Sequence, residues 1–234
     1  MRVSAIIVAA GSGTRLGHSE PKAFVELGAQ PLLYYSLRTI REVAAVAEVI
    51  VTLPPGKEAA ARLAAQHAGL RLPLKVTPGG AERQDSVRIA LSLTSTDSTM
   101  VLVHDAARPF AGAGIFQACI EAASRSGGAI AAIPVTDTLK ETAQSMVTAT
   151  RPRAGLFAAQ TPQAFRRELL LAGHAAGAEQ PMPATDDAFL VERLGTAVEI
   201  VPGSALNFKI TTPEDLRLAR ALIASDRVLA SQFE

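Results

Sequence analysis

The feature that most constrains the fold is an alternation of short apolar runs with segments of helical periodicity. The runs are continuously apolar, which is typical of strands buried on both faces of a sheet. Strands of this kind alternating with helices predict a parallel sheet with helices on both sides. The apolar runs cover 3–10, 46–54, 72–77, 98–105 and 127–135, and the helical patterns cover 31–43, 57–68, 81–93 and 112–126. The expected fold class is therefore α/β, a Rossmann-like three-layer sandwich.

The alternation changes after Val135. Two short threonine-rich segments follow, with 143–145 between them, and they predict a protruding β-hairpin arm at about 136–154. A lone two-stranded ribbon is marginally stable, so the arm packs either on a second subunit or at an edge of its own sheet. The later patterns predict helices at 162–172 and 184–194, a strand at 197–202, and a closing helix from Pro213 that Thr212 caps. The whole chain, 1–234, is expected to form one domain.

Ligands of such sheets bind beyond the carboxyl ends of the strands. The loops that follow the first, third and fourth strands should therefore open onto one crevice. These loops read "GSGTRLGHSEPK", "PGGAERQDS" and "DAARPF".

The first loop resembles a dinucleotide fingerprint but has the wrong spacing. Gly11 and Gly13 fit G-x-G-x-x-G, yet Leu16 occupies the third glycine position and the glycine comes at Gly17. No suitable carboxylate follows the second strand, where Glu58 is a poor match. The lysine before Ser or Thr that ends a Walker-type loop is also missing. An NAD-dependent oxidoreductase is therefore a weak alternative.

The same loop carries two cations, Arg15 and Lys22, beside glycines that let backbone N–H groups face an anion. Nucleotidyl transfer builds negative charge on phosphate oxygens in the transition state, and fixed cations stabilise that charge. Either residue alone would be read as a solvated loop charge. The pair inside a glycine loop favours a triphosphate-binding function.

The other two loops offer further polar groups. Asp105, at the end of the fourth strand, can hold Mg²⁺ carried by a triphosphate, or can instead cap the next helix. Arg108 can clamp a phosphate, whereas His104 is read as a packed strand-end histidine. Gly79 and Gly80 suit close approach to a flat ligand such as a base, although a turn before a helix explains them nearly as well.

Composition excludes several classes of protein. A formal net charge of +1 gives no broad basic field for nucleic acid. The apolar start is too short for a membrane span. A single cysteine, Cys119, cannot form an internal disulfide, and no leader pattern is visible, so a cytoplasmic location is expected.

Seven motifs occur in an order and approximate spacing that resemble the 2-C-methyl-D-erythritol 4-phosphate cytidylyltransferases. They are "AAGSGTRLG…PKAF", "GGAERQDSV", "VHDAARP", "DTLK", "AQTPQAF", "ATDDA" and "NFKITTPEDL", and they span nearly the whole chain. The glycine loop alone is shared with many sugar-nucleotide transferases. "HDAARP" together with "TPQ" and "NFKIT" is much more specific.

The resemblance implies a single nucleotidyltransferase domain. It would join CTP and methylerythritol phosphate to give a CDP-linked product and pyrophosphate, with Mg²⁺, in the non-mevalonate isoprenoid pathway. Arg15 and Lys22 match positions that stabilise the α-phosphate, and Arg153 and Lys209 match positions that orient the acceptor phosphate. The positions that match cytidine and phosphate contacts are Ala9, Ala10, Gly11, Gly13, Gly80, Ala81, Ser86 and Ala106. The positions that match acceptor contacts are Asp105, Arg108, Thr138, Arg153, Thr161, Thr185 and Lys209.

The resemblance also implies a homodimer, because Thr138 and Arg153 match arm residues that reach a partner's site. Arg151 can replace Arg153 if the register across Pro152 differs. Two more alternatives stay open: a ribitol-5-phosphate cytidylyltransferase, and a non-catalytic nucleotide-binding or assembly protein. The pair of Arg15 and Lys22 argues against the second.

Overall fold

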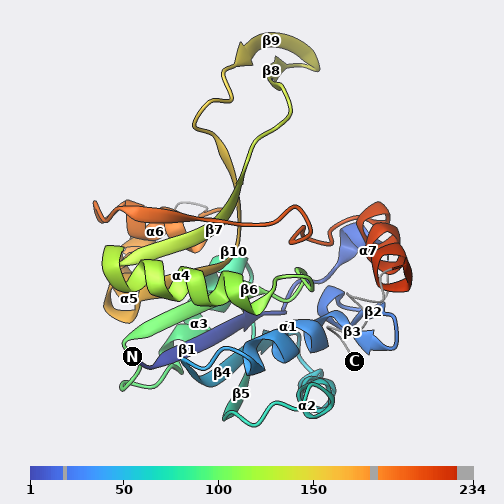
Figure 1. Cartoon of the computed structure of the whole chain (residues 1–234), viewed down its shortest axis with the longest axis vertical. Coiled ribbons are helices and arrows are strands. Elements are labelled where there is room, and N and C mark those ends of the chain that lie inside the picture. Colours follow the sequence, from blue (N-terminus) through green and yellow to red (C-terminus); the bar gives the residue numbers. More distant parts are fainter. Residues whose placement is uncertain (18–19, 180–183, 226–234) are drawn as a thin grey trace.

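The computed structural model describes residues 1–17, 20–179 and 184–225, which form a three-layer α/β body with a long projecting arm (Figure 1). The central sheet has seven strands in the order β11-β7-β10-β6-β1-β4-β5. The strands are β1 (Val3–Val8), β4 (Val46–Leu53), β5 (Leu74–Pro78), β6 (Met100–Asp105), β7 (Gly128–Pro134), β10 (Phe157–Arg166) and β11 (Val198–Pro202). All neighbouring pairs run parallel except those that β10 makes with β6 and β7. The predicted fold class is confirmed.

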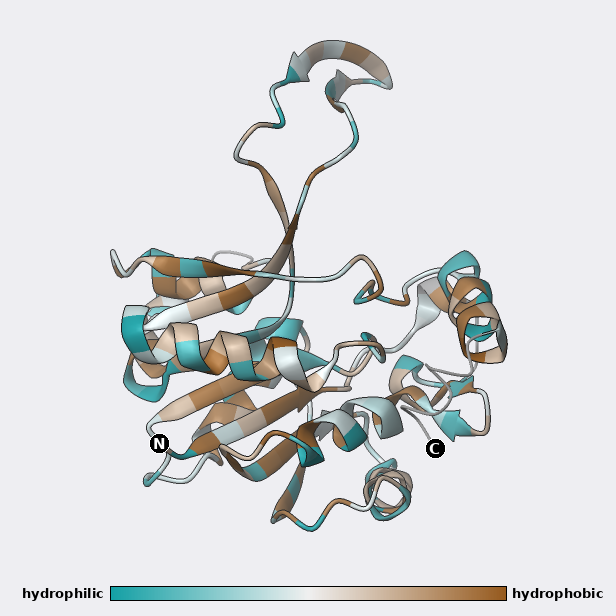
Figure 2. Cartoon of the chain, viewed as in Figure 1, coloured by the Kyte–Doolittle hydropathy of each residue, from teal (hydrophilic) through white to brown (hydrophobic). Residues whose placement is uncertain are grey.

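Helices cover both faces of the sheet. They are α1 (Leu32–Arg41), α2 (Glu58–His67), α3 (Arg83–Ser92), α4 (Ala113–Ser126), α5 (Arg167–Glu179), α6 (Asp187–Glu192) and α7 (Pro213–Ser225). Consecutive residues of β1 show why its apolar run is continuous: Ile7 packs in one apolar cluster and Ile6 in the other. Figure 2 shows the resulting hydrophobic strands between the helical layers. Among the described helices, none is long and apolar enough to cross a membrane.

The closing helix begins as its sequence predicts. The Thr212 hydroxyl accepts a hydrogen bond from the Asp215 backbone N–H at 3.3 Å, and the Asp215 carboxylate accepts one from the Thr212 N–H at 2.8 Å. This reciprocal pair satisfies two N–H groups at the helix start. It fixes where α7 leaves the loop that carries Lys209.

The helix expected over 162–172 is wrong in its first half. Residues up to Arg166 belong to β10, and α5 begins only at Arg167. The Phe165 side chain is fully buried, and its backbone pairs with Val101 of β6 and Gly128 of β7. Pro162 suggested a helix start, but this segment pairs with β6 on one side and β7 on the other. These tertiary contacts override the local preference for helix.

The arm stands apart from the body. Its two strands, β8 (Leu139–Ala143) and β9 (Met146–Arg151), form a separate antiparallel sheet. Gln144 and Ser145 turn the chain between them with positive φ. Because the described arm strands pair only with each other, packing at the edge of the main sheet is excluded (Figure 1).

Candidate active site

The three predicted loops meet at one cavity of about 420 Å³ at the carboxyl ends of β1 and β6. The cavity is lined by residues of the first loop, of the loop before α3, of the loop after β6, and by Lys209. Most residues predicted from the sequence to contact nucleotide or phosphate lie in its wall. They are Ala9, Ala10, Gly11, Lys22, Gly80, Ala81, Ser86, Asp105, Ala106 and Lys209.

The first loop folds back so that Lys22 lines the cavity. Gly13 has φ of 75°, and a Cβ there would lie 2.9 Å from the backbone nitrogen of Lys22. Glycine is therefore required at 13 for both conformation and space. Gly11 differs, because a Cβ at that position meets nothing within 4 Å.

The departure from the dinucleotide fingerprint now has a structural reason. Leu16, at the third glycine position, lies in a short helical turn, η1 (Thr14–Leu16), and is buried in the core. Arg15 belongs to the same turn, but its side chain lies outside the described part of the structure. Its predicted role stays a prediction.

The absence of side chains at Gly79 and Gly80 allows the backbone of this loop to pack closely against neighbouring residues of the protein. A Cβ at Gly79 would lie 2.2 Å from the Cβ of Ala10, and one at Gly80 would lie 2.2 Å from the Cβ of Asp85. Ser86 is buried; its hydroxyl accepts from the Gly80 N–H at 3.0 Å and donates to the Glu82 carbonyl at 3.2 Å. Ser86 therefore fixes the shape of the glycine turn.

Asp105, at the end of β6, is held by two cations. Its Oδ1 lies 3.0 Å from Arg83 Nε, and its Oδ2 lies 2.7 Å from Lys209 Nζ. Burial alone would raise the pKa of this carboxyl, but the charges of Arg83 and Lys209 outweigh burial and hold the pKa well below its usual range. No side chain caps the start of α4, so the alternative role of Asp105 as a helix cap is excluded.

Arg83 extends this contact into the interior. Its NH1 lies 2.7 Å from Oδ2 of Asp187, which is buried at the start of α6. His174 Nε2 lies 3.2 Å from the other oxygen of that carboxylate. Burial would raise the pKa of Asp187, but the Arg83 charge and the His174 contact lower it. Asp187 is therefore a charged, buried support for Arg83.

His104 holds the loop that follows β6. The Thr161 hydroxyl accepts from the Asp105 N–H at 3.0 Å and lies 3.1 Å from His104 Nδ1. The hydroxyl therefore donates to Nδ1, and the Nε2–H donates to the Arg108 carbonyl at 3.3 Å. Burial lowers the pKa of His104 to about 4, which keeps the ring neutral. The interpretation of His104 as a packed strand-end histidine is confirmed.

A smaller cavity of about 210 Å³ adjoins the first. Its wall includes Arg108, Thr161 and Thr185, three residues predicted to contact the acceptor. Arg108 also donates to the Asn207 carbonyl at 2.7 Å and to the Ala159 carbonyl at 3.4 Å, so part of its guanidinium holds backbone. Three residues, Arg83, Asp105 and Lys209, line both cavities.

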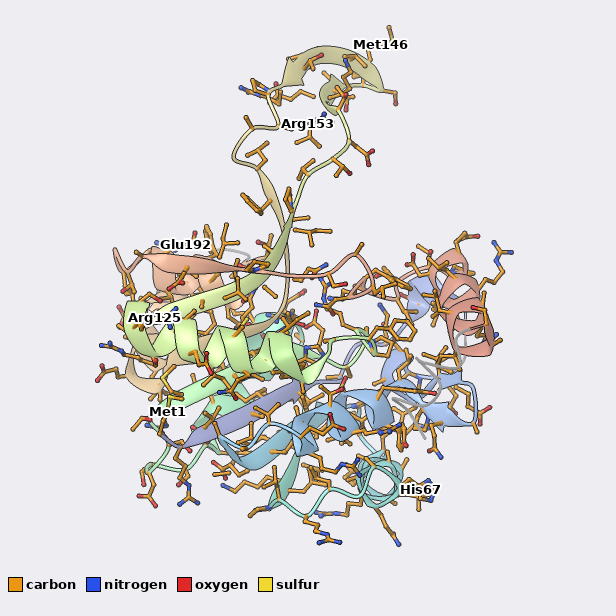
Figure 3. The ribbon with its side chains drawn as sticks, viewed as in Figure 1. Met1, His67, Arg125, Met146, Arg153 and Glu192 are labelled. Carbon is orange, nitrogen blue, oxygen red and sulfur yellow. The ribbon has the colours of Figure 1, made fainter. Side chains whose placement is uncertain are left out.

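Two predicted acceptor residues lie elsewhere. Thr138 and Arg153 are exposed on the arm and line neither cavity of their own chain. Figure 3 shows Arg153 on the arm, away from the body. Arg153 donates to the Thr136 carbonyl, while Arg151 forms a 2.6 Å ion pair with Glu141 on the facing strand. Both arginines therefore contact the arm itself, and the choice between Arg151 and Arg153 stays a prediction.

Asp105 is suited to a hard divalent cation. The described residues contain no group of three or more His, Cys, Asp or Glu that could enclose a metal ion. Mg²⁺ instead prefers one or two carboxylates together with phosphate oxygens. Each oxygen of Asp105 has one cation partner, and a carboxylate oxygen has two lone pairs. The residues present therefore fit a nucleotide-borne Mg²⁺.

The sequence analysis missed four residues whose contacts hold the walls of the two cavities in place. Each lies in a recognised motif, but its partner is distant in the chain. Gln163 accepts from the Asp187 and Ala188 N–H groups at 3.2 and 3.3 Å, and Asn207 donates to the Thr161 carbonyl at 2.9 Å. The missed residues are Arg83, Gln163, Asp187 and Asn207.

The comparisons with known proteins all identify the same family. The sequence profile of the family described as 2-C-methyl-D-erythritol 4-phosphate cytidylyltransferase matches residues 3–225. A protein of that name from Pelotomaculum thermopropionicum is 41% identical over 224 residues, 95% of this chain and 94% of the relative. One from Deinococcus radiodurans is 46% identical over 221 residues, 94% of this chain and 89% of the relative. The crystal structure of the Thermus thermophilus protein of that name gives a TM-score of 0.80 at 41% identity, over 96% and 100% of the two chains.

Proposed function

Because the chain belongs to the 2-C-methyl-D-erythritol 4-phosphate cytidylyltransferase family, we propose that its two adjoining cavities bind the two substrates of that reaction. The enzyme joins CTP and 2-C-methyl-D-erythritol 4-phosphate and releases pyrophosphate, a step of isoprenoid biosynthesis. The product is 4-diphosphocytidyl-2-C-methyl-D-erythritol. The proposal concerns which residues carry the reaction.

One observation carries this assignment: Arg83, Asp105 and Lys209 form a wall common to both cavities. CTP is assigned to the larger cavity, whose glycine loops present backbone N–H groups to phosphates. The acceptor phosphate is assigned to the smaller one. The two reacting groups then meet at the shared wall, as in-line attack requires.

The transfer needs no covalent enzyme intermediate. A phosphate oxygen of the acceptor forms a bond to the α-phosphorus of CTP. The bond from that phosphorus to the bridging oxygen breaks, and pyrophosphate leaves with the electron pair. Lys22 and Arg15 stabilise the charge that develops on the α-phosphate, while Lys209 and Arg153 orient the acceptor phosphate.

The cytidine would be recognised mainly through backbone. Ala9, Ala10 and Gly11 follow β1, while Gly80 and Ala81 precede α3, so both segments offer N–H and carbonyl groups at the cavity. Ala106 completes this wall after Asp105. Gly13 and Ser86 act through the shape of their loops rather than by direct contact.

Asp105 is the residue proposed to bind Mg²⁺. When bound, the ion would neutralise part of the triphosphate charge and favour departure of pyrophosphate. The carboxylate is suited to this because its depressed pKa keeps it ionised at every physiological pH. Lys209 shares the same carboxylate and so stays beside the incoming acceptor phosphate.

A homodimer through the arm completes the acceptor site in this proposal. Thr138 and Arg153 lie exposed on the arm and line neither cavity of their own chain. The arm also exposes large apolar side chains, with Met146 at 72% and Val147 at 60%.

Pyrophosphate release is the decisive assay. The purified protein is incubated with Mg²⁺, 2-C-methyl-D-erythritol 4-phosphate and, in turn, CTP, ATP, GTP or UTP. Release with CTP well above the other nucleotides is expected. Ribitol 5-phosphate is the matched alternative acceptor, and preference for it would contradict the acceptor assignment.

A further inference from the structure

Arg83 lies where the buried interior meets the shared wall of the two cavities. Its Nε contacts Oδ1 of Asp105, and its NH1 contacts Oδ2 of Asp187, at 3.0 and 2.7 Å. The two carboxylates belong to different layers of the fold, one at the end of β6 and the other at the start of α6. A planar guanidinium can hold two such groups in a fixed relative orientation.

The interior end of this contact is rigid. Asp187 is 1% exposed, its N–H donates to Gln163 of β10, and its second oxygen contacts His174 of α5. Backbone, helix and strand therefore all fix the position of this carboxylate. A group held by Asp187 has little freedom to move.

The other cation on Asp105 is less constrained. The side chain of Lys209 is 38% exposed, whereas that of Arg83 is 22% exposed. Lysine is a point charge on a flexible stem. Of the two contacts, that to Arg83 is therefore the better suited to fix the direction of the Asp105 carboxylate.

We propose that Arg83 is a positioning residue for the transfer reaction: it ties Asp105 to Asp187 and thereby fixes the wall between the nucleotide and acceptor cavities. This inference rests on the proposed function of the two cavities. Asp105 acts on the substrates, and Arg83 acts through Asp105. A misplacement of about 1 Å at a reacting centre can cost about a hundredfold in rate.

The experiment compares Arg83→Gln, Arg83→Lys and Asp187→Asn with the wild type. We measure kcat, the KM for each substrate, the Mg²⁺ concentration for half-maximal rate, and thermal unfolding. Arg83→Gln should lower kcat about 10- to 100-fold and raise the Mg²⁺ requirement, with a smaller change in the KM for CTP. Arg83→Lys should recover part of kcat because it keeps one charged contact.

The control is Arg88→Gln. Arg88 lies on the same helix, five residues further on, and its exposed side chain pairs with Asp85 at 3.7 Å. The kcat of this variant should equal that of the wild type. Comparing Arg83→Gln with Arg88→Gln therefore distinguishes the effect of the position of Arg83 from the general effect of losing an arginine on this helix.

Asp187→Asn keeps Arg83 in the chain and tests the proposal if Arg83→Gln does not fold. It should lower kcat in the same direction, and the loss should be smaller in an Arg83→Lys background than in the wild type if the two act as one unit. Unchanged kcat and Mg²⁺ requirement in folded Asp187→Asn and Arg83→Lys would overturn the inference while leaving the proposed function intact. An inactive wild type measured in parallel would overturn both.

Discussion

The nucleotide cavity and the arm differ in how the rest of the chain supports them. The cavity wall contains buried and half-buried charged groups that are paired, as Asp105 is with Arg83 and Lys209. The arm is exposed on both faces, and its strands pair only with each other in the described chain. One region is held in place before any substrate arrives, and the other has no internal support.

This difference assigns separate tasks to the two regions. Preorganised groups stabilise a transition state because they need no rearrangement during the reaction. A two-stranded ribbon is marginal alone and gains order when it packs on another surface. In our proposal the cavity therefore carries the chemistry, and the arm supplies Arg153 to the cavity of a second copy.

The largest expected effect tests the role of the cavity in the reaction. Lys22→Ala should lower kcat about a hundredfold or more, which is the scale of losing one group that stabilises transition-state charge. Steady-state pyrophosphate release measures it. Arg71→Ala is the control, because Arg71 is exposed in the loop before β5, at the opposite end of the strands. Near-normal turnover of Lys22→Ala would refute this role.

The second prediction tests the role of the arm in the reaction. Arg153→Ala should lower turnover about 10- to 100-fold because the acceptor phosphate loses a fixed cation. The fold of the body should be unaffected, so thermal unfolding should match that of the wild type. Arg151→Ala, two residues earlier in the arm, should have a smaller effect.

Mixing variants sharpens that result. Lys22→Ala and Arg153→Ala should each have reduced activity, but a mixed dimer restores one intact site if the arm crosses between copies. Random exchange at equal amounts should recover about a quarter of the wild-type activity. No recovery after verified subunit exchange would place Arg153 in its own chain's site.

The third prediction uses the pH dependence of stability to test the buried His104 side chain at the end of β6. The pKa of His104 falls from 6.5 to about 4 on burial, so the unfolded chain binds a proton that the folded chain does not. The free energy of unfolding therefore has its full value above pH 6.5 and decreases as the pH falls toward 4. At pH 5 it should be about 2 kcal/mol lower than at high pH.

His104→Gln should remove that dependence. The free energy of unfolding, measured with denaturant, should differ most between wild type and variant near pH 8, and the gap should narrow toward pH 5. The difference at pH 8 reports the lost contacts to Thr161 and Arg108. A gap that stays constant with pH would contradict a neutral buried histidine.

The smallest expected effect separates two glycines of the first loop. Gly13 and Gly17 both have positive φ, so alanine at either should cost about 1 kcal/mol of stability. Only alanine at Gly13 meets the Lys22 backbone, whereas nothing lies near a Cβ at Gly17. Gly13→Ala should therefore also lower kcat, and equal kcat for the two variants would argue against it.

The sequence predicts the layers of the fold because each buried strand carries its own signal. Continuous apolar runs such as 46–54 identify strands without knowledge of their neighbours. The cavity residues follow from the same logic, because parallel strands end at one edge. The arm position near 136–154 follows from its threonine-rich composition, and its separate two-stranded sheet agrees.

What escaped prediction depends on distant partners. β10 is a strand because β6 and β7 leave a position between them, which no local pattern in 157–166 reveals. Arg83 matters because of Asp187, 104 residues later. The roles of the individual site residues stay predictions, since they require bound substrates.

The contact between Gly79 and Ala10 has a consequence for engineering. The segments that follow β1 and β5 touch so closely that the missing Cβ at 79 defines how far apart they can lie. A loop transplanted alone from a relative with another base preference would collide with its unchanged neighbour or leave a gap. Altering nucleotide preference in this scaffold therefore requires exchanging both loops together, as one cassette.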